Sequence, residues 1–189
     1  MPTVFSHPAV PLAVGLGLGR ARIPPRLLLA GVAVSILPDL DSLTFRVGIS
    51  YGAALGHRGL SHSLLFAVAV GLVGACAYRA LRTGWGRAFA FLCLATASHG
   101  VLDACTTGGL GVAFLWPWSQ ARHFAPLQVI EVAPLSLARL LSPRGATVLA
   151  SELLWVWLPC AAAGLALAGL RVGLARRGAG AAMRPGGTP

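Results

Sequence analysis

The sequence predicts an all-helical protein that crosses a membrane about four to five times. Of its 189 residues, 56% are hydrophobic and 11% are charged, and the mean hydropathy is +0.76. A soluble domain usually carries about 25% charged residues, because its surface must be hydrated. A core of this size could not bury the apolar excess, which therefore faces lipid. The spacing of the apolar segments and the placement of the arginines support the same fold class.

Five apolar segments follow one another along the chain, at residues 3–19, 24–37, 63–78, 88–105 and 147–170. A helix needs roughly 20 apolar residues to cross a bilayer. The fifth segment meets this length easily. The second is short, so we expect either that its helix continues past Pro38 or that the bilayer is thinner there.

All fifteen basic residues are arginines, and they lie in clusters between the apolar segments, mainly at 20–26, 79–87 and 171–184. Basic residues mark cytoplasmic loops, so the remaining connections are predicted to lie on the extracytoplasmic face of the cell (inner) membrane. A net charge of +10 would suggest nucleic-acid binding in a soluble protein. Here the arginines are better explained as topology signals, and no nucleic-acid partner is expected.

The chain is predicted to form one membrane-embedded domain over residues 1–177. Residues 178–189 consist almost entirely of Gly, Ala and Pro with one Arg, and they are expected to be disordered. The four cysteines include no close pair, which fits neither a disulfide framework nor a zinc knuckle. No basic region of a cleavable signal peptide precedes the first apolar segment, which is therefore expected to remain in the mature protein.

Four of the five histidines and all three aspartates fall into four short clusters. These are His7, Asp39 with Asp41, His57 with His62, and His99 with Asp103. Two apolar segments separate the first cluster from the second, and two more separate the third from the fourth. Alternating spans therefore place all four clusters at the same membrane face. Ionisable groups inside a membrane protein usually face a partner or a site, so this convergence predicts a metal centre.

Each cluster also has a purely structural interpretation. His99 and Asp103 lie four residues apart on one helix face and could form a hydrogen bond between helices. Asp39 and Asp41 could satisfy free backbone amides at a helix end, and Ser61 could cap the next helix. The convergence of the clusters favours the metal centre over these separate explanations.

Imidazole with carboxylate is a ligand set for Zn²⁺ above all, with Mn²⁺ or Fe²⁺ as alternatives. The predicted ligands are His7, Asp39, Asp41, His57, His62, His99 and Asp103. Seven candidates exceed the four ligands that one zinc ion usually takes, so one or two ions are expected. Asp41 and Arg58 are predicted to be catalytic, with the Arg58 guanidinium neutralising a phosphoryl-type oxyanion. Alternatively, Arg58 could anchor to a lipid headgroup.

The residues that form these clusters also resemble the YdjM-like family of membrane-bound, metal-dependent hydrolases. The matching parts are His7, the Pro-Asp-Leu-Asp run at 38–41, the His-Arg-Gly-Leu-Ser-His-Ser block at 57–63, His99 with Asp103, and the Trp-Pro-Trp-Ser run at 116–119 with Arg122. The resemblance covers about residues 7–136, and the block at 57–63 is its most specific part. It implies a multi-span fold, a divalent metal and hydrolase activity at Asp39, Asp41, His57, Arg58, His62, His99 and Asp103.

These observations together predict an integral membrane hydrolase in which a metal-activated water attacks an ester bond. The expected substrate is a small-molecule or lipid ester, such as a lipid-linked ester or a phosphoester, and the expected partners are membrane lipids. Two alternatives come from other classes. One is a non-catalytic metal-binding protein or transporter, and the other is a structural membrane protein whose histidines and aspartates only hold helices together. The sequence does not define the oligomeric state.

Overall fold

The computed structural model describes residues 1–134 and 137–182. This part of the chain is helical and contains no β-strand, which confirms the all-helical part of the predicted fold class. The helices are α1 (Ala9–Leu18), α2 (Pro25–Ile36), η1 (Leu37–Val47), η2 (Leu60–His62), α3 (Leu64–Cys76), α4 (Trp85–Ala104), α5 (Leu137–Leu140), α6 (Pro143–Glu152), η3 (Leu153–Trp157) and α7 (Leu158–Ala182).

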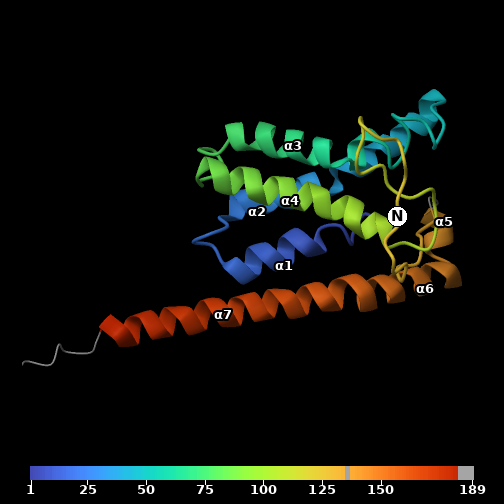
Figure 1. Ribbon diagram of the computed structural model, residues 1–189. Helices are drawn as coiled ribbons and strands as arrows, with labels where there is room; N and C mark the ends of the chain where they lie inside the picture. Colours follow the sequence, from blue (N-terminus) through green and yellow to red (C-terminus); the bar gives the residue numbers. More distant parts are fainter. Residues whose placement is uncertain (135–136, 183–189) are drawn as a thin grey trace, which may run out of the picture.

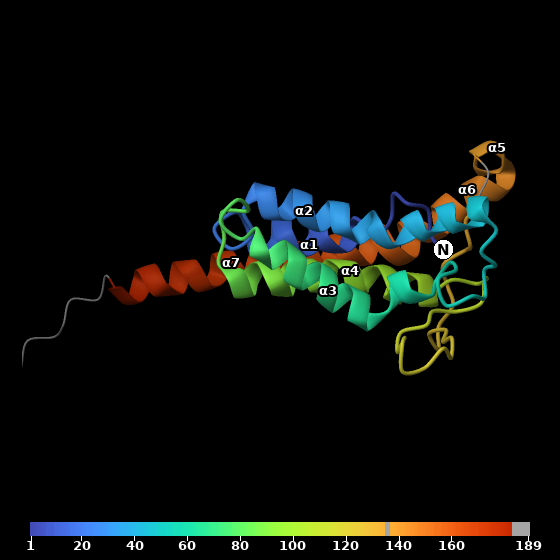
Figure 2. The same cartoon turned by 90° about the horizontal axis from the view of Figure 1, so that it is seen from above.

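Helices α1 to α4 lie side by side, and α7 runs along the bundle beside α1 and extends past its end (Figures 1 and 2). The long connections 37–63 and 105–134, the N-terminus and α6 gather at one end of the bundle. We call this the site end. The short α1–α2 and α3–α4 connections lie at the opposite end, which we call the arginine end because it carries the clusters at 20–26 and 79–87.

The second apolar segment does continue beyond Pro38. Proline lacks the backbone N–H that an α-helix needs and clashes with the preceding turn, so the helix tightens to 3₁₀ geometry from Leu37 onward. The combined helix Pro25–Val47 has 23 residues and a mean hydropathy of 1.6, enough to cross a membrane. It ends at Gly48, which has the positive φ typical of a helix terminus.

The last apolar segment lies in a second long helix. Helices α6, η3 and α7 are continuous, and Pro143–Arg177 forms a candidate span of 35 residues. Two further apolar helices, Ala9–Leu18 and Leu64–Cys76, are shorter than a full span. Within the described residues, two helices are therefore both long and apolar enough to cross a membrane, and the figure of four to five spans stays a prediction. Helix α7 continues to Ala182, so the domain boundary predicted at residue 177 falls inside a helix. Residues 183–189 lie outside the described part.

The exposed surface of the helices is apolar in the manner of a lipid-facing protein. Only 6% of the most apolar part of the last long helix is buried, and Leu165 exposes 74% of its surface. A core of Leu27, Phe91, Leu92 and their neighbours joins α2, α3 and α4 near the arginine end. Contiguous apolar surface on this scale is stable only against lipid or a partner.

Ser63, and not Ser61 as one structural explanation of the block at 57–63 supposed, caps the start of α3. The helix is capped by Ser63, whose Oγ accepts a hydrogen bond from the Phe66 backbone N–H at 3.1 Å. The alternative cap, Ser61, instead donates a hydrogen bond to Asp41 Oδ2. Ser61 therefore belongs to the polar cluster at the site end.

Candidate metal centre

The structure brings all seven predicted ligands together at the site end of the bundle. The 3₁₀ helix η1 supplies Asp39 and Asp41, while the last turns of α4 supply His99 and Asp103. The segment before α3 carries His57 and His62, and the segment before α1 carries His7. Two groups have ligand atoms within 4.8 Å of one another: Asp39, His62, His99 and Asp103, and Asp41, His57 and His62.

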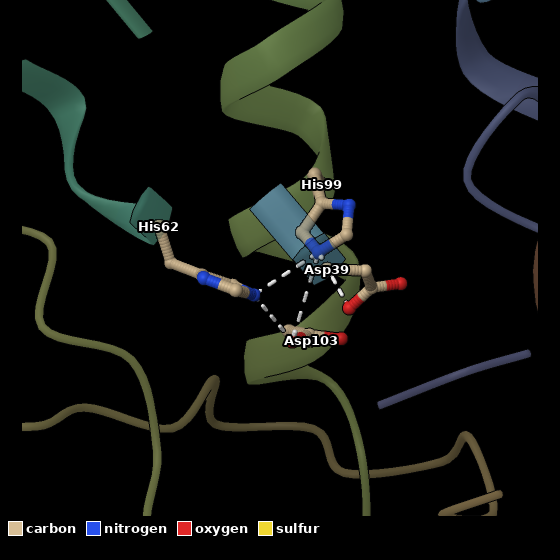
Figure 3. Close-up of side chains that lie close together, drawn as sticks. All are labelled: Asp39, His62, His99 and Asp103. Carbon is tan, nitrogen blue, oxygen red and sulfur yellow. Dashed lines mark hydrogen bonds and ion pairs between the residues drawn. The ribbon is translucent and has the colours of Figure 1, made fainter. Parts of the chain in front are cut away.

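The first of these groups, shown in Figure 3, is the metal cluster. His62 Nε2 and His99 Nε2 face each other at 3.0 Å. The same His62 nitrogen lies 3.2 Å from Asp103 Oδ2, and His99 Nε2 lies 3.4 Å from Asp39 Oδ1. All four residues are buried. Two nitrogens and two carboxylate oxygens thus point into one small volume, as the ligands of a single cation do.

The tautomer of His99 is fixed by its surroundings. His99 Nδ1 lies 2.7 Å from the Ser35 carbonyl oxygen, which can only accept a hydrogen bond. Nδ1 therefore carries the proton, and Nε2 presents its lone pair to the metal cluster. A backbone carbonyl behind the ring is a common way of orienting a metal-binding histidine.

Both carboxylates of the metal cluster lack the hydrogen bonds that buried anions require. Among the described residues, neither oxygen of Asp39 has a hydrogen-bond partner, and the same holds for Asp103, although its Oδ2 lies close to the Arg58 guanidinium. Leaving a buried carboxylate unsatisfied costs several kcal/mol, so native proteins pair such groups or bind a cation there. This buried, unsatisfied N₂O₂ set fits a divalent metal.

The electrostatics at His62 point the same way. Burial lowers the pKa of the imidazole, but the Asp103 and Asp41 carboxylates, which lie 3.2 and 3.1 Å from its two ring nitrogens, outweigh burial and raise this pKa to about 9. The surrounding carboxylates therefore favour a positive charge at the ring. The same carboxylates would stabilise a cation bound between His62, His99 and Asp103.

His7 closes the metal cluster on its other side. Its ring stacks on His99 with the ring centroids 3.6 Å apart. It is fully buried, and neither of its nitrogens has a hydrogen-bond partner in the described part of the chain. His7 Nε2 lies 3.6 Å from Asp39 Oδ2 and 3.9 Å from Asp103 Oδ1. Each aspartate thus turns one oxygen toward His62 and His99 and the other toward His7.

Asp41 lies behind His62, on the side away from the metal cluster. Asp41 Oδ1 lies 2.5 Å from His57 Nδ1, and Asp41 Oδ2 lies 3.1 Å from His62 Nδ1. Asp41 Oδ2 also accepts hydrogen bonds from the Ser61 hydroxyl and from the Arg58 backbone N–H. The carboxylate therefore orients two imidazole rings at once.

The Arg58 side chain is occupied by protein groups. Its guanidinium donates from Nη1 to the Gly108 carbonyl and from Nη2 to Thr106 Oγ1, both at 3.0 Å, while Nε lies 3.1 Å from Asp103 Oδ2. The residue is fully buried, and its backbone φ of 62° is unusual for a residue other than glycine. This geometry holds Asp103 and the loop after α4 in place. The guanidinium thus contacts protein groups, whereas the sequence suggested a phosphoryl group or a lipid headgroup as its partner.

Sequence reasoning assigned no role in the site to Glu152 or Ser61. The Glu152 carboxylate accepts hydrogen bonds from the backbone N–H and the hydroxyl of Thr3 and from the hydroxyl of Ser6. It therefore ties the segment that carries His7 to the last long helix. A lone acid in an apolar segment is itself a signal for such a role. For Ser61, the signal was its place between two histidines of the specific block at 57–63.

Comparison with known proteins assigns the family. The model of the YdjM inner membrane protein family matches residues 1–176, which confirms the resemblance carried by the motifs above. The chain is also 54% identical over 162 residues to inner membrane protein YbcI of Escherichia coli (strain K12), a match that covers 84% of this chain and 92% of the relative. No solved structure matches. The buried His/Asp centre thus sits in a chain that belongs to the YdjM inner membrane protein family.

Proposed function

We propose that this membrane protein is a metal-dependent hydrolase that cleaves an ester bond at the membrane interface. The observation that carries the proposal is the metal cluster, in which two imidazole nitrogens and two unsatisfied buried carboxylates converge. Most buried ion-pair networks satisfy their own polar atoms, so unsatisfied groups of this kind mark a functional site.

Asp39, His62, His99 and Asp103 would hold the ion, with His7 adjacent. Mixed imidazole and carboxylate ligands favour Zn²⁺, with Mn²⁺ or Fe²⁺ as alternatives. One ion suits the metal cluster itself. A second ion would be bound either by the carboxylate oxygens that face His7 or by the group of Asp41, His57 and His62.

A divalent ion bound at this place would supply water activation and polarisation of the scissile group. The chain's own contribution to proton transfer is the pair of His57 and Asp41. Asp41 holds His57 Nδ1 at 2.5 Å, which fixes the ring and leaves its other nitrogen to exchange a proton with the reacting groups. Arg58 is a positioning residue in this scheme, because it contacts Asp103 and the loop after α4.

The surroundings of the site favour a substrate that lies in or on the membrane. On η1, Leu40 and Leu43 expose 57% and 52% of their surfaces beside Asp39 and Asp41. An apolar rim next to a polar centre suits the boundary between headgroups and acyl chains. We therefore propose a lipid-linked ester or phosphoester as the substrate, reached from the extracytoplasmic face that the arginine distribution predicts.

Metal removal gives the first test. The protein purified in detergent is expected to contain about one to two equivalents of divalent metal and to hydrolyse some member of a panel of phosphoesters and lipid esters. Chelation should abolish turnover, and Zn²⁺ or Mn²⁺ should restore it. Stable metal binding with no turnover across the panel would support the alternative of a non-catalytic metal-binding protein. Metal-dependent uptake into proteoliposomes would support a transporter.

A second test separates proton transfer from metal binding. His57→Gln is expected to retain the ion of the metal cluster, because His57 lies outside that cluster, yet to lose about 100-fold or more in kcat. The matched control is His123→Gln, since His123 is exposed and far from the clusters in sequence. If His57→Gln keeps full kcat, His57 takes no part in proton transfer.

A further inference from the structure

A second polar feature lies at the arginine end, away from the metal cluster. A pocket of about 300 Å³ is bounded by Arg20 of the α1–α2 connection and by Arg171 of α7, with Leu16, Ile23 and Leu28 among its apolar walls. The five acidic residues of the chain belong to the site end or to α6 next to it. Within the described residues, the arginines that pair with carboxylates are Arg58 and Arg144. Two cations thus face this pocket without an acidic partner.

The position of Arg171 is built into the fold. Its guanidinium lies directly over Gly19, where an added Cβ would come within 1.5 Å of Nη1. Gly19 also has a φ of 79°, a conformation that favours glycine. The turn that ends α1 therefore leaves room for the Arg171 side chain and places it beside Arg20.

An apolar groove adjoins the pocket. It runs between α1 and α7, has a volume of about 440 Å³ and shares Leu16 with the pocket between Arg20 and Arg171. Small residues line it, among them Ala13, Ala161 and Ala168. Gly17 of α1 and Gly164 of α7 allow the two helices to pack closely, since a Cβ on Gly17 would lie 2.8 Å from the Gly164 carbonyl oxygen.

We propose that the pocket and the groove together bind one anionic phospholipid, with its phosphate between Arg20 and Arg171 and an acyl chain along α1 and α7. Guanidinium groups bind phosphate oxygens through paired hydrogen bonds, and basic pockets between membrane helices are typical headgroup sites. The adjoining groove favours a lipid over free phosphate, because only a lipid has an acyl chain that the apolar groove can bind. This site is separate from the metal cluster and does not depend on its activity.

The test measures lipid retained by the full-length protein. Protein extracted into detergent and mixed with phosphatidylglycerol or phosphatidylcholine is examined by native mass spectrometry and thermal unfolding. We expect bound phosphatidylglycerol and a rise in Tm, with neither from phosphatidylcholine. Arg20→Gln with Arg171→Gln should reduce the bound fraction at least about fivefold, as expected for losing both phosphate contacts. The matched control, Arg87→Gln with Arg176→Gln, removes the same charge from exposed positions outside the pocket and should change little.

Two further arms distinguish the source of the anion. Ala161→Phe should fill the groove and weaken phosphatidylglycerol binding while leaving both arginines in place. Inorganic phosphate should raise Tm far less than the lipid does. Equal losses in the two double variants would overturn the proposal in favour of nonspecific surface charge. Equal stabilisation by phosphate and lipid, with no effect of Ala161→Phe, would overturn it in favour of a soluble anion.

Discussion

Asp39→Asn is expected to lower the affinity of the purified protein for divalent metal by at least about 100-fold, because changes even behind a ligand cost about 10–100-fold. Asp39 Oδ1 is one of the four ligand atoms of the metal cluster. Asparagine has nearly the same shape but lacks the negative charge. Metal content after dialysis and competition titration with a chelator measure the loss.

Comparison with Asp103→Asn makes this prediction specific. Both substitutions should remove metal, but their effects on the metal-free protein should differ. Within residues 1–134 and 137–182, Asp39 has no hydrogen-bond partner and no arginine beside it, so its neutralisation should leave Tm unchanged or raise it. Asp103 faces Arg58 at 3.1 Å, and losing it leaves a buried cation unpaired, at a cost of about 3–5 kcal/mol.

Glu131→Gln serves as the control for a lost carboxylate at the same end. Glu131 forms a partly exposed ion pair with Arg144, and such pairs contribute only about 0–1 kcal/mol. Full metal retention in Asp39→Asn would contradict the assignment of the metal cluster. Metal loss equal in Glu131→Gln and Asp39→Asn would indicate that overall charge, not ligation, governs binding.

The sequence predicts the convergence of the clusters because topology alone constrains it. Alternating helices return His7, Asp39, His62 and His99 to one end, and the structure places them there. The helical class follows in the same way from composition. Both properties depend on the order of segments along the chain, which is visible without coordinates.

The division of roles within the centre could not be predicted from the sequence. Asp39 and Asp41 are two residues apart, yet one faces the metal cluster and the other lies behind His62. Residues two apart point in different directions on a helix, and only packing decides which of them faces inward. The orientation of Arg58 depends likewise on the loop at 106–108, whose path is a tertiary property.

Glu152→Leu is expected to destabilise the protein by about 3 kcal/mol and to weaken metal binding as well. Leucine keeps much of the volume but accepts no hydrogen bond, so the Thr3 backbone N–H and the Thr3 and Ser6 hydroxyls lose their shared acceptor. The segment that holds His7 in place would then be released. Thermal unfolding and chelator competition report the two effects separately.

Glu152→Gln and a double-mutant cycle show whether Glu152 acts through His7. Glutamine keeps one carbonyl oxygen for the Thr3 N–H, and the hydroxyls can turn to accept from its amide, so most of the metal affinity should return. If Glu152 positions His7, His7→Ala combined with Glu152→Leu should bind metal no more weakly than His7→Ala alone. Contacting residues deviate from additivity by about 0.5–3 kcal/mol, whereas a purely structural Glu152 gives additive losses. Coupling in metal affinity therefore distinguishes a positioning residue from one that only stabilises the fold.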